Sequence, residues 1–187
     1  MRAALLDRDG VINRDCDAYV KSWEEFEFLP GALTGLCLLA RAGVQVAVVS
    51  NQSAVGRGIM SAAALEAINL RMVEAVRREG GRIGAVLCCL HAPADGCQCR
   101  KPRPGLLSQA LRRLAVDHGN AVMVGDHLTD LQAAWAARLP AVLVLSGRGP
   151  QTLVQPEADS CPLTFVAQDL LEAARWLVSR QRAWPWQ

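Results

Sequence analysis

The sequence predicts an α/β fold with a doubly wound parallel sheet. Apolar runs rich in strand-forming residues alternate along the chain with segments of helical periodicity. The predicted strands are mostly continuous apolar runs, which is typical of strands that helices cover on both faces. No linker rich in proline, glycine or serine divides the 187 residues. We therefore expect one Rossmann-like domain over residues 1–187.

Six segments are predicted to form the strands. The first covers residues 3–6 and ends just before Asp7. The next four cover residues 44–49, 83–88, 121–124 and 141–145, and a weaker one covers residues 163–166. The connection over residues 14–30 is too short for a folded lid. We therefore expect an open or lightly covered site and no cap domain.

Five segments have the apolar spacing of amphipathic helices. In residues 31–42, Leu33, Leu36, Cys37 and Ala40 share one face. Residues 61–79 form the next helix, with Ser61 as the expected N-cap. The remaining helices are expected over residues 105–116, 130–138 and 168–180, and Pro140 stops the second of these. The tail at residues 183–187 is expected to be a loosely docked terminus.

Composition and charge exclude several classes of protein. Hydrophobic residues make up 51% and charged residues 20% of the chain, as in ordinary globular proteins. A net charge of +2 provides no basic stripe, so we expect no nucleic-acid partner. No apolar run approaches the roughly 18 residues of a membrane span, and no signal-peptide pattern precedes the first strand. We expect no membrane partner, and the lack of exposed apolar runs favours a monomer.

The cysteine count bears on the cellular compartment. The chain has seven cysteines, and four of them lie within residues 88–99. An odd, crowded set favours metal-bound or free thiols over a disulfide framework. We therefore expect a cytoplasmic protein.

Asp7 and Asp9 follow the first predicted strand at its C-terminal end, where open α/β sheets bind their ligands. Residues two apart share a face of an extended segment, so the two carboxylates are expected to point the same way. Such a pair can form a hard-metal site, an acid and a base with separated pKa values, or a nucleophile with its proton-transfer partner. Taken alone, the same residues can also simply form a turn.

The segment after the second strand, residues 50–58, opens at the same edge of a parallel sheet. It carries hydroxyl, amide and guanidinium groups at Ser50, Asn51, Gln52, Ser53 and Arg57. These groups suit a cluster of phosphate oxygens. Runs of this composition after strands are also common as plain turns, so both interpretations stay open for this segment by itself.

Cys89, His91, Cys97 and Cys99 form two pairs of potential metal ligands, with one residue inside each pair. Four such ligands fit tetrahedral Zn²⁺ and leave no open position for chemistry, so we expect a structural zinc in a short loop. Cys88 competes with Cys89, but only Cys89 gives the spacing that Cys97 and Cys99 repeat. Unligated thiols are the alternative. Zinc can contribute roughly 10 kcal/mol to ordering such a loop.

Arg100 and Lys101 come directly after this loop. Two adjacent cations at the sheet edge can compensate a doubly charged phosphate, and Pro102 and Pro104 stiffen the segment that carries them. A solvated charge run is the alternative for these residues alone.

Asp126 leaves the fourth predicted strand as Asp7 leaves the first. This third carboxylate, with waters and a substrate oxygen, completes the donors of an octahedral Mg²⁺ site. Asp130 stands at the start of the next helix. It is either a helix residue favoured by the dipole or a partner that supports the metal ligands from behind.

Together, these motifs resemble the haloacid dehalogenase-like phosphatase superfamily. Asp-Arg-Asp-Gly, Asn-Gln-Ser with Arg-Gly, Cys-x-His, Cys-x-Cys-Arg-Lys-Pro-x-Pro-Gly and Gly-Asp-x-x-x-Asp follow one another in the order of that family. More narrowly, residues 3–147 resemble the D-glycero-D-manno-heptose 1,7-bisphosphate 7-phosphatases. The histidinol-phosphate phosphatases share the zinc loop but tend to lack Arg57-Gly58 and Pro104-Gly105. His127 stands where a lysine is common.

The resemblance implies a covalent route for a small phosphosugar in nucleotide-activated heptose and lipopolysaccharide core synthesis. Asp7 is the implied nucleophile and Asp9 the general acid and base. Mg²⁺ is held by the Asp7 carboxylate, the Asp9 backbone carbonyl and the Asp126 carboxylate. Ser50, Arg100 and Lys101 stabilise the phosphoryl group. The residues left to contact the rest of the substrate are Asp15, Tyr19, Asn51, Gln52, Ser53, Arg57 and His127.

Three other functions compete with this interpretation. A signalling phospho-acceptor domain also uses an aspartate at a strand end, but it has no use for Asp9 or for a zinc loop. A zinc-ordered binding module would not keep every catalytic motif intact. A dinucleotide-binding oxidoreductase is excluded because no Gly-x-Gly-x-x-Gly follows the first strand.

Overall fold

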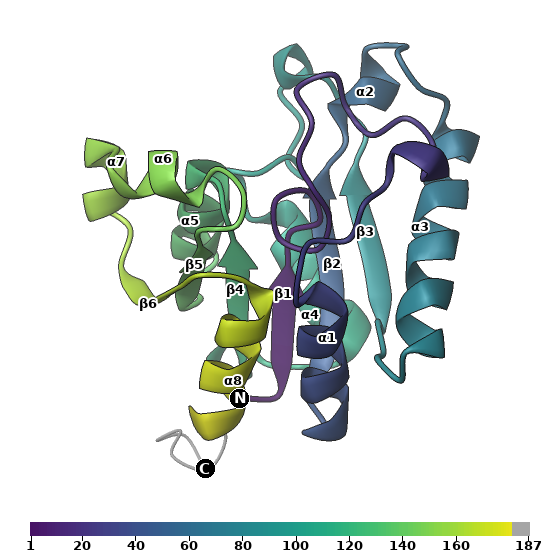
Figure 1. The fold of residues 1–187 in the computed structure, drawn as a ribbon. Helices are drawn as coiled ribbons and strands as arrows, with labels where there is room; N and C mark the ends of the chain where they lie inside the picture. The colour runs from purple at the N-terminus through teal and green to yellow at the C-terminus, as the bar shows by residue number, and fades with distance from the viewer. Residues whose placement is uncertain (181–187) are drawn as a thin grey trace.

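The structure, a computed structural model, describes residues 1–180 and confirms the predicted fold class (Figure 1). Its six strands form one parallel sheet in the order β3-β2-β1-β4-β5-β6. They are β1 (Ala3–Leu6), β2 (Gln45–Asn51), β3 (Ala85–Cys89), β4 (Ala121–Gly125), β5 (Ala141–Val144) and β6 (Leu163–Ala167). The tail at residues 183–187 lies outside the described residues.

All five predicted helices are present, with shorter ones between them. The helices are α1 (Ala32–Arg41), α2 (Ser53–Gly56), α3 (Ala62–Arg78), α4 (Gly105–Leu114), α5 (Leu128–Ala136), α6 (Gly149–Leu153), α7 (Pro156–Asp159) and α8 (Leu170–Arg180). Three 3-10 turns are η1 (Trp23–Glu25), η2 (Pro93–Asp95) and η3 (His118–Asn120). The unpredicted α2, α6 and α7 are too short to show an apolar period. No helix within residues 1–180 is both long and apolar enough to cross a membrane.

Helix α5 begins two residues earlier than predicted. The His127 side chain accepts a hydrogen bond from the backbone N–H of Thr129 and acts as the N-cap. Asp130 reaches back to the backbone N–H of His127 and completes a capping box. This start could not be predicted, because histidine is not among the preferred N-cap residues.

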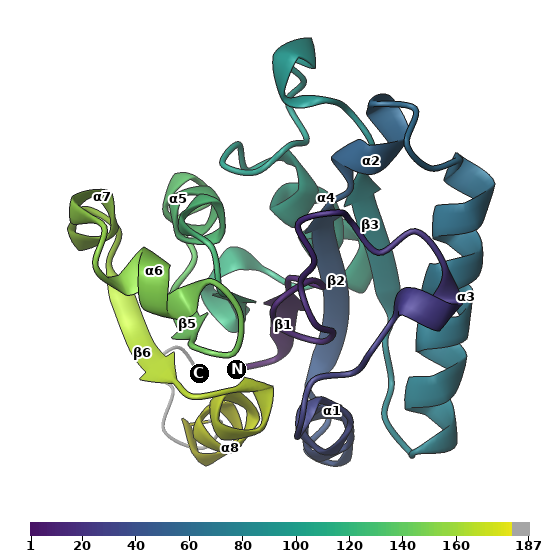
Figure 2. The same ribbon diagram turned by 45° about the horizontal axis from the view of Figure 1, so that its top comes forward.

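The sheet is covered on both faces, which explains its continuous apolar strands. In β1, Ala4 and Leu6 face one core cluster, and Ala3 and Leu5 face the other. Helices α1, α3 and α8 supply the first cluster, whereas α4 and α5 supply the second. Figure 2 shows these two helix layers on either side of the sheet.

The carboxyl ends of the strands all lie at one edge, the upper edge in Figure 1. There the chain passes from β1 into the loop over residues 7–31, from β2 into α2, and from β3 into the loop of residues 90–104. The strand order reverses between β1 and β4, the place where doubly wound folds bind their ligands. The fold therefore brings the predicted site residues to one edge.

Candidate active site

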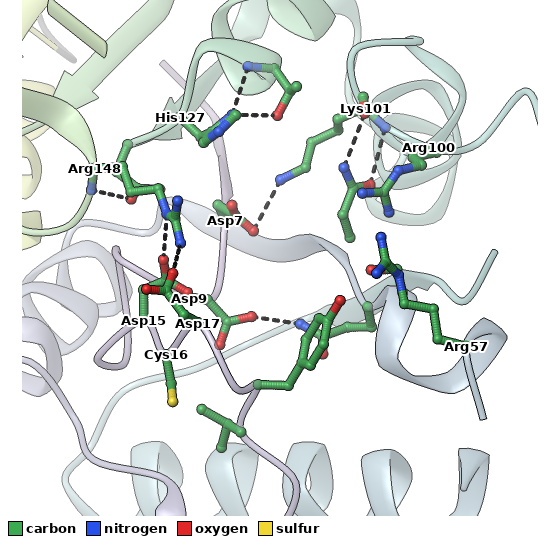
Figure 3. A pocket seen from close by; sticks show the side chains of 17 residues that line it. Asp7, Asp9, Asp15, Cys16, Asp17, Arg57, Arg100, Lys101, His127 and Arg148 are labelled. Carbon is green, nitrogen blue, oxygen red and sulfur yellow. Dashed lines mark hydrogen bonds and ion pairs between the residues drawn. The ribbon is translucent and has the colours of Figure 1, made fainter. Parts of the chain in front are cut away.

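A polar cavity of about 320 Å³ opens at this edge (Figure 3). Its volume is in the range of small-molecule sites. Twelve of its lining residues were expected at the site: Asp7, Asp9, Asp15, Tyr19, Asn51, Gln52, Ser53, Arg57, Arg100, Lys101, Asp126 and His127. The others are Cys16, Asp17, Val20, Thr129 and Arg148. Ser50 and Asp130 are buried behind this wall.

Lys101 forms the centre of the buried end. Its side chain is only 1% exposed, yet its ammonium lies 3.0 Å from Asp7 and 2.6 Å from Asp130. It also donates to the backbone carbonyl of Val49 at 2.9 Å. Burial acts to lower the pKa of Lys101, but Asp130 and Asp7 together raise it above its ordinary value. A permanent cation is thus fixed beside the predicted nucleophile.

Asp126 is enclosed by backbone. Its carboxylate accepts a hydrogen bond from the backbone N–H of Arg148 at 2.7 Å. A side chain at Gly10 or Gly147 would overlap this carboxylate, so glycine is required at both positions. Burial, reinforced by the charges of Asp130 and Asp7, raises the pKa of Asp126 to about 8.

The carboxylates of Asp7, Asp126 and Asp130 form a cluster in which one oxygen from each lies within 4.8 Å of the others. Burial raises the pKa of Asp7 to about 7, although Lys101 opposes this shift. Hard oxygen donors crowded in this way fit Mg²⁺. Asp7 and Asp126 line the cavity whereas Asp130 lies behind its wall, so Asp7 and Asp126 are the carboxylates best placed for the cation. The Asp9 carboxylate lies outside this cluster.

The Asp9 carboxylate is held by three side chains. Arg8 forms an ion pair with it at 3.0 Å, and Asn13 donates to it at 2.9 Å. Gln52 donates through its amide nitrogen at 2.6 Å and uses the same nitrogen to reach the Ser50 hydroxyl at 2.8 Å. The predicted pair of carboxylates therefore lines one cavity, with Asp9 anchored separately from Asp7.

Asn51 fixes the backbone that carries Lys101. Its amide nitrogen donates to the Lys101 carbonyl at 3.0 Å, and its amide oxygen accepts from the Lys101 N–H at 3.1 Å. The side chains of Asn51 and Gln52, both expected to contact substrate, are thus engaged with the protein. Their direct contribution to substrate binding remains a prediction.

Arg100 and Arg57 also line the cavity, on the side away from Arg148 in Figure 3. One terminal nitrogen of Arg100 is buried and has no hydrogen-bond partner among the described residues. Leaving a buried guanidinium nitrogen without a hydrogen-bond partner costs free energy, so this group is suited to bind an anion.

The opposite, outer wall is made of loops. Arg148 pairs with Asp15 at 2.7 Å and with Asp17 at 2.5 Å, as Figure 3 shows. Tyr19 lies in the same loop as both aspartates and has a left-handed backbone, with φ of 62°. His127 contributes its ring to the wall while one ring nitrogen caps α5, and burial lowers its pKa. These side chains surround the space beyond the predicted phosphate position.

Cys89, His91, Cys97 and Cys99 come together beside this edge. Their sulfur atoms lie 3.3–3.5 Å apart, far longer than a disulfide bond and near the spacing of about 3.7 Å expected around tetrahedral zinc. Cys88 points elsewhere, because its sulfur accepts a hydrogen bond from Asn69. The choice of Cys89 over Cys88 therefore agrees with the structure.

Two arginines with contacts to the site were not predicted from the sequence. Arg8 stands between Asp7 and Asp9 in the first motif, so its position was a usable signal. Arg148 lies in a Gly-Arg-Gly segment after β5 that has no distinguishing pattern. Only the fold shows that the loop after β5 returns to Asp126.

Comparison with known proteins identifies the family. A HAD-hydrolase-like family model matches residues 98–173. The D-glycero-beta-D-manno-heptose-1,7-bisphosphate 7-phosphatase of Pseudomonas aeruginosa is 41% identical over 174 residues, covering 93% of this chain and 96% of the relative. The protein of the same name from Bordetella bronchiseptica is 43% identical over 179 residues, covering 93% and 100%.

The fold agrees with that assignment. A crystal structure of the B. bronchiseptica D,D-heptose 1,7-bisphosphate phosphatase, complexed with magnesium and phosphate, matches this structure with a TM-score of 0.90 and 42% identity. The match covers 96% of this chain and 99% of the other. The chain therefore belongs to the heptose-1,7-bisphosphate 7-phosphatases of the haloacid dehalogenase-like hydrolases.

Proposed function

We propose that this chain removes the 7-phosphate of D-glycero-β-D-manno-heptose 1,7-bisphosphate through a phospho-aspartate intermediate. The observation that carries the proposal is the buried Asp7–Lys101–Asp130 array at the base of a polar cavity of about 320 Å³. The β anomer follows the names of the two relatives described above. We place the reaction in nucleotide-activated heptose and lipopolysaccharide precursor synthesis.

In the proposed reaction, Asp7 attacks phosphorus in line with the leaving sugar oxygen. Asp9 protonates that oxygen and later takes a proton from the water that hydrolyses the phospho-aspartate. Lys101 and Arg100 bind the equatorial phosphoryl oxygens, and the Ser50 hydroxyl assists them. Fixed charges of this kind provide most of the catalysis in phosphoryl transfer.

We propose Mg²⁺ as the catalytic cation. The Asp7 and Asp126 carboxylates would hold it, joined by the Asp9 backbone carbonyl, and the donor set fits because the carboxylate oxygens already converge. When bound, Mg²⁺ neutralises the anions that would otherwise repel one another during attack on a phosphate dianion. The magnesium and phosphate bound by the B. bronchiseptica protein support this choice.

We propose a structural Zn²⁺ in the Cys89–His91–Cys97–Cys99 cluster. Soft thiolate and imidazole ligands select this metal, and four protein ligands leave no position for substrate. The loop has its own support in Arg103, which donates to the carbonyls of Gly96 and Cys97. Zinc would hold the loop so that Arg100 and Lys101, which follow it directly, keep their positions.

The remaining assignments concern the setting of the enzyme. Reduced thiols are needed for the zinc cluster, which supports a cytoplasmic location. We also propose that residues 1–187 act as one domain without a cap, as a monomer, on a free phosphosugar. Asp15, Tyr19 and His127 on the outer wall, together with Ser53 and Arg57 elsewhere around the cavity, would contact the sugar and its 1-phosphate.

A phosphate-release panel tests the proposal. The substrates are α- and β-heptose 1,7-bisphosphate, fructose 1,6-bisphosphate and histidinol phosphate, each assayed with Mg²⁺. We expect the highest kcat/KM for the β-heptose bisphosphate and only one phosphate released from it. Preference for histidinol phosphate would instead indicate a histidinol-phosphate phosphatase. Stoichiometric phosphorylation without turnover would indicate a phospho-acceptor domain.

A further inference from the structure

Arg8 is a fully buried cation directly beside Asp9. Its side chain is 1% exposed, and its one ion pair among residues 1–180 is with Asp9. The guanidinium donates to both oxygens of the Asp9 carboxylate. One terminal nitrogen lies 3.0 Å from Oδ1 and 3.1 Å from Oδ2, and Nε lies 3.3 Å from Oδ1. This forked contact fixes the orientation of a carboxylate as well as its position.

Two further side chains anchor Arg8 itself. The Gln52 amide oxygen, at the end of β2, accepts a hydrogen bond from it at 3.1 Å. The Asn69 amide oxygen, on α3, accepts another at 3.3 Å. Arg8 therefore ties the loop after β1 to two other elements, and Gln52 contacts both Arg8 and Asp9. The Asp9 carboxylate has no freedom to swing without breaking this network.

A stability role alone does not account for such a pair. Buried ion pairs are often no more stabilising than apolar side chains of similar volume, because both charges lose their hydration. This pair instead stands where proton transfer is proposed. We infer that Arg8 is a positioning residue that holds Asp9 in line with the leaving oxygen. The inference rests on the proposed function, since it assigns a role within that reaction.

The step in question is the first one. The bond between an Asp7 oxygen and phosphorus forms while the bond from phosphorus to the sugar oxygen breaks, and the Asp9 proton moves to that oxygen. A sugar alkoxide leaves poorly without this proton, whereas p-nitrophenolate leaves well without it. Loss of Asp9 positioning should therefore slow the sugar substrate much more than p-nitrophenyl phosphate.

The experiment compares kcat/KM for β-heptose 1,7-bisphosphate and p-nitrophenyl phosphate. The value of kcat/KM depends only on the steps up to and including the first irreversible one. It therefore does not include the later use of Asp9 as a base. We expect Arg8→Lys, which keeps the charge but loses the fork, to lower the ratio of the two values by at least about tenfold. Asn69→Leu, which removes an anchor of Arg8 together with the hydrogen bond to the Cys88 sulfur, should lower the ratio in the same direction by a smaller factor.

Arg71→Lys is the matched control, because Arg71 is an exposed arginine of α3, and its ratio should equal that of the wild type. An unchanged ratio in folded Arg8→Lys, whether or not both kcat/KM values fall, would overturn the inference. If Arg8→Lys does not fold, Asn69→Leu decides alone, and an unchanged ratio there overturns it. Wild-type activity on the heptose bisphosphate is measured first, so failure of the proposed function is seen separately.

Discussion

The two ends of the cavity are built from the same kinds of charge in opposite surroundings. At the buried end, the Lys101 side chain is 1% exposed and its partner Asp130 is fully buried. At the outer end, Arg148 is 47% exposed and its partner Asp17 is 93% exposed. Both ends contain one cation held by two aspartates, so burial is the main difference between them.

The difference in burial determines how costly a substitution is at each end of the cavity. Breaking a buried pair leaves an uncompensated charge and typically costs about 3–5 kcal/mol. An exposed pair contributes about 0–1 kcal/mol, because water competes for both partners. The buried end is therefore confined to one arrangement, suited to the phosphoryl chemistry that every substrate shares. The outer end can change at little cost to the fold, which suits selection of the sugar.

The largest effect is expected at the nucleophile. Asp7→Asn keeps the size of the side chain but removes the attacking oxygen charge, so kcat should fall below about one hundredth of wild type (roughly 2.7 kcal/mol of barrier). Steady-state kinetics and circular dichroism measure activity and fold. Asp15→Asn is the matched control at the outer end and should keep far more activity. A higher residual kcat in Asp7→Asn would show that the covalent route is wrong.

The next effect links the zinc cluster to Lys101. Cys99→Ser should lose the single zinc expected per chain and strongly lower kcat/KM, with an unchanged Mg²⁺ dependence. Lys101→Ala should lower kcat/KM comparably and retain zinc. Because both changes disable one unit, their combination should cost much less than the sum of the two.

Metal analysis and kinetics of the two single variants and the double variant measure this coupling. The Asn51 clamp on the Lys101 backbone holds part of the geometry without zinc, so some activity should survive in Cys99→Ser. Strictly additive losses would mean that the loop contributes to stability alone.

A smaller effect is expected from pH on Mg²⁺ binding. In the metal-free protein, burial raises the pKa of Asp7 to about 7 and of Asp126 to about 8. Protons therefore compete with the cation, and affinity should fall by about tenfold per pH unit for each proton displaced as pH drops through these values. Calorimetric titration between about pH 6 and 8.5 measures this dependence. Affinity that does not change over this range would contradict the raised pKa values.

The same shifts predict how stability depends on pH. A carboxyl whose pKa is raised by folding binds its proton more tightly in the native state, so the metal-free protein should lose stability as pH rises toward about 8. Mg²⁺ should therefore raise the Tm more at about pH 8.5 than at about pH 6. Thermal unfolding with and without Mg²⁺ tests this, and an equal gain at both pH values would count against it.

The smallest effect is expected at the outer end. Arg148→Ala removes two exposed ion pairs but keeps the backbone N–H that binds Asp126. The loop with Asp15 and Asp17 should then loosen, so KM for the heptose bisphosphate should rise by about three- to tenfold with little change in kcat. A large loss of kcat would show that Arg148 acts on the chemistry.

Much of the buried end could be predicted from the sequence. Strand ends mark where parallel sheets place their chemistry, and Asp7 and Asp126 stand directly after apolar runs. The position of Lys101 next to the ligand-rich loop indicated the cation. What Asp130 does could not be chosen, because helix capping and support of a catalytic group call for the same residue type. In the structure Asp130 both caps α5 and pairs with Lys101, so its support of catalysis stays a prediction.

The outer end could be predicted only in part, for a physical reason. Asp15 and Tyr19, which line the cavity, were named through the family resemblance, but Arg148 lies about 130 residues away in the chain and meets Asp15 only after folding. The role of Arg8 was missed for a different reason. A charged residue between two aspartates at a strand end is expected to point to solvent, whereas here it is buried by its contacts with Gln52 and Asn69.

The comparison between the two ends is tested most directly by measuring kcat/KM for β-heptose 1,7-bisphosphate and for p-nitrophenyl phosphate in Lys101→Ala and Arg148→Ala. Lys101→Ala should lower both values by similar large factors, because both substrates present a phosphoryl group to the buried end. Arg148→Ala should lower the value for the heptose bisphosphate and leave that for p-nitrophenyl phosphate within about threefold of wild type. A similar loss on both substrates in Arg148→Ala, or unimpaired p-nitrophenyl phosphate hydrolysis in Lys101→Ala, would contradict the division between a chemical end and a selective end.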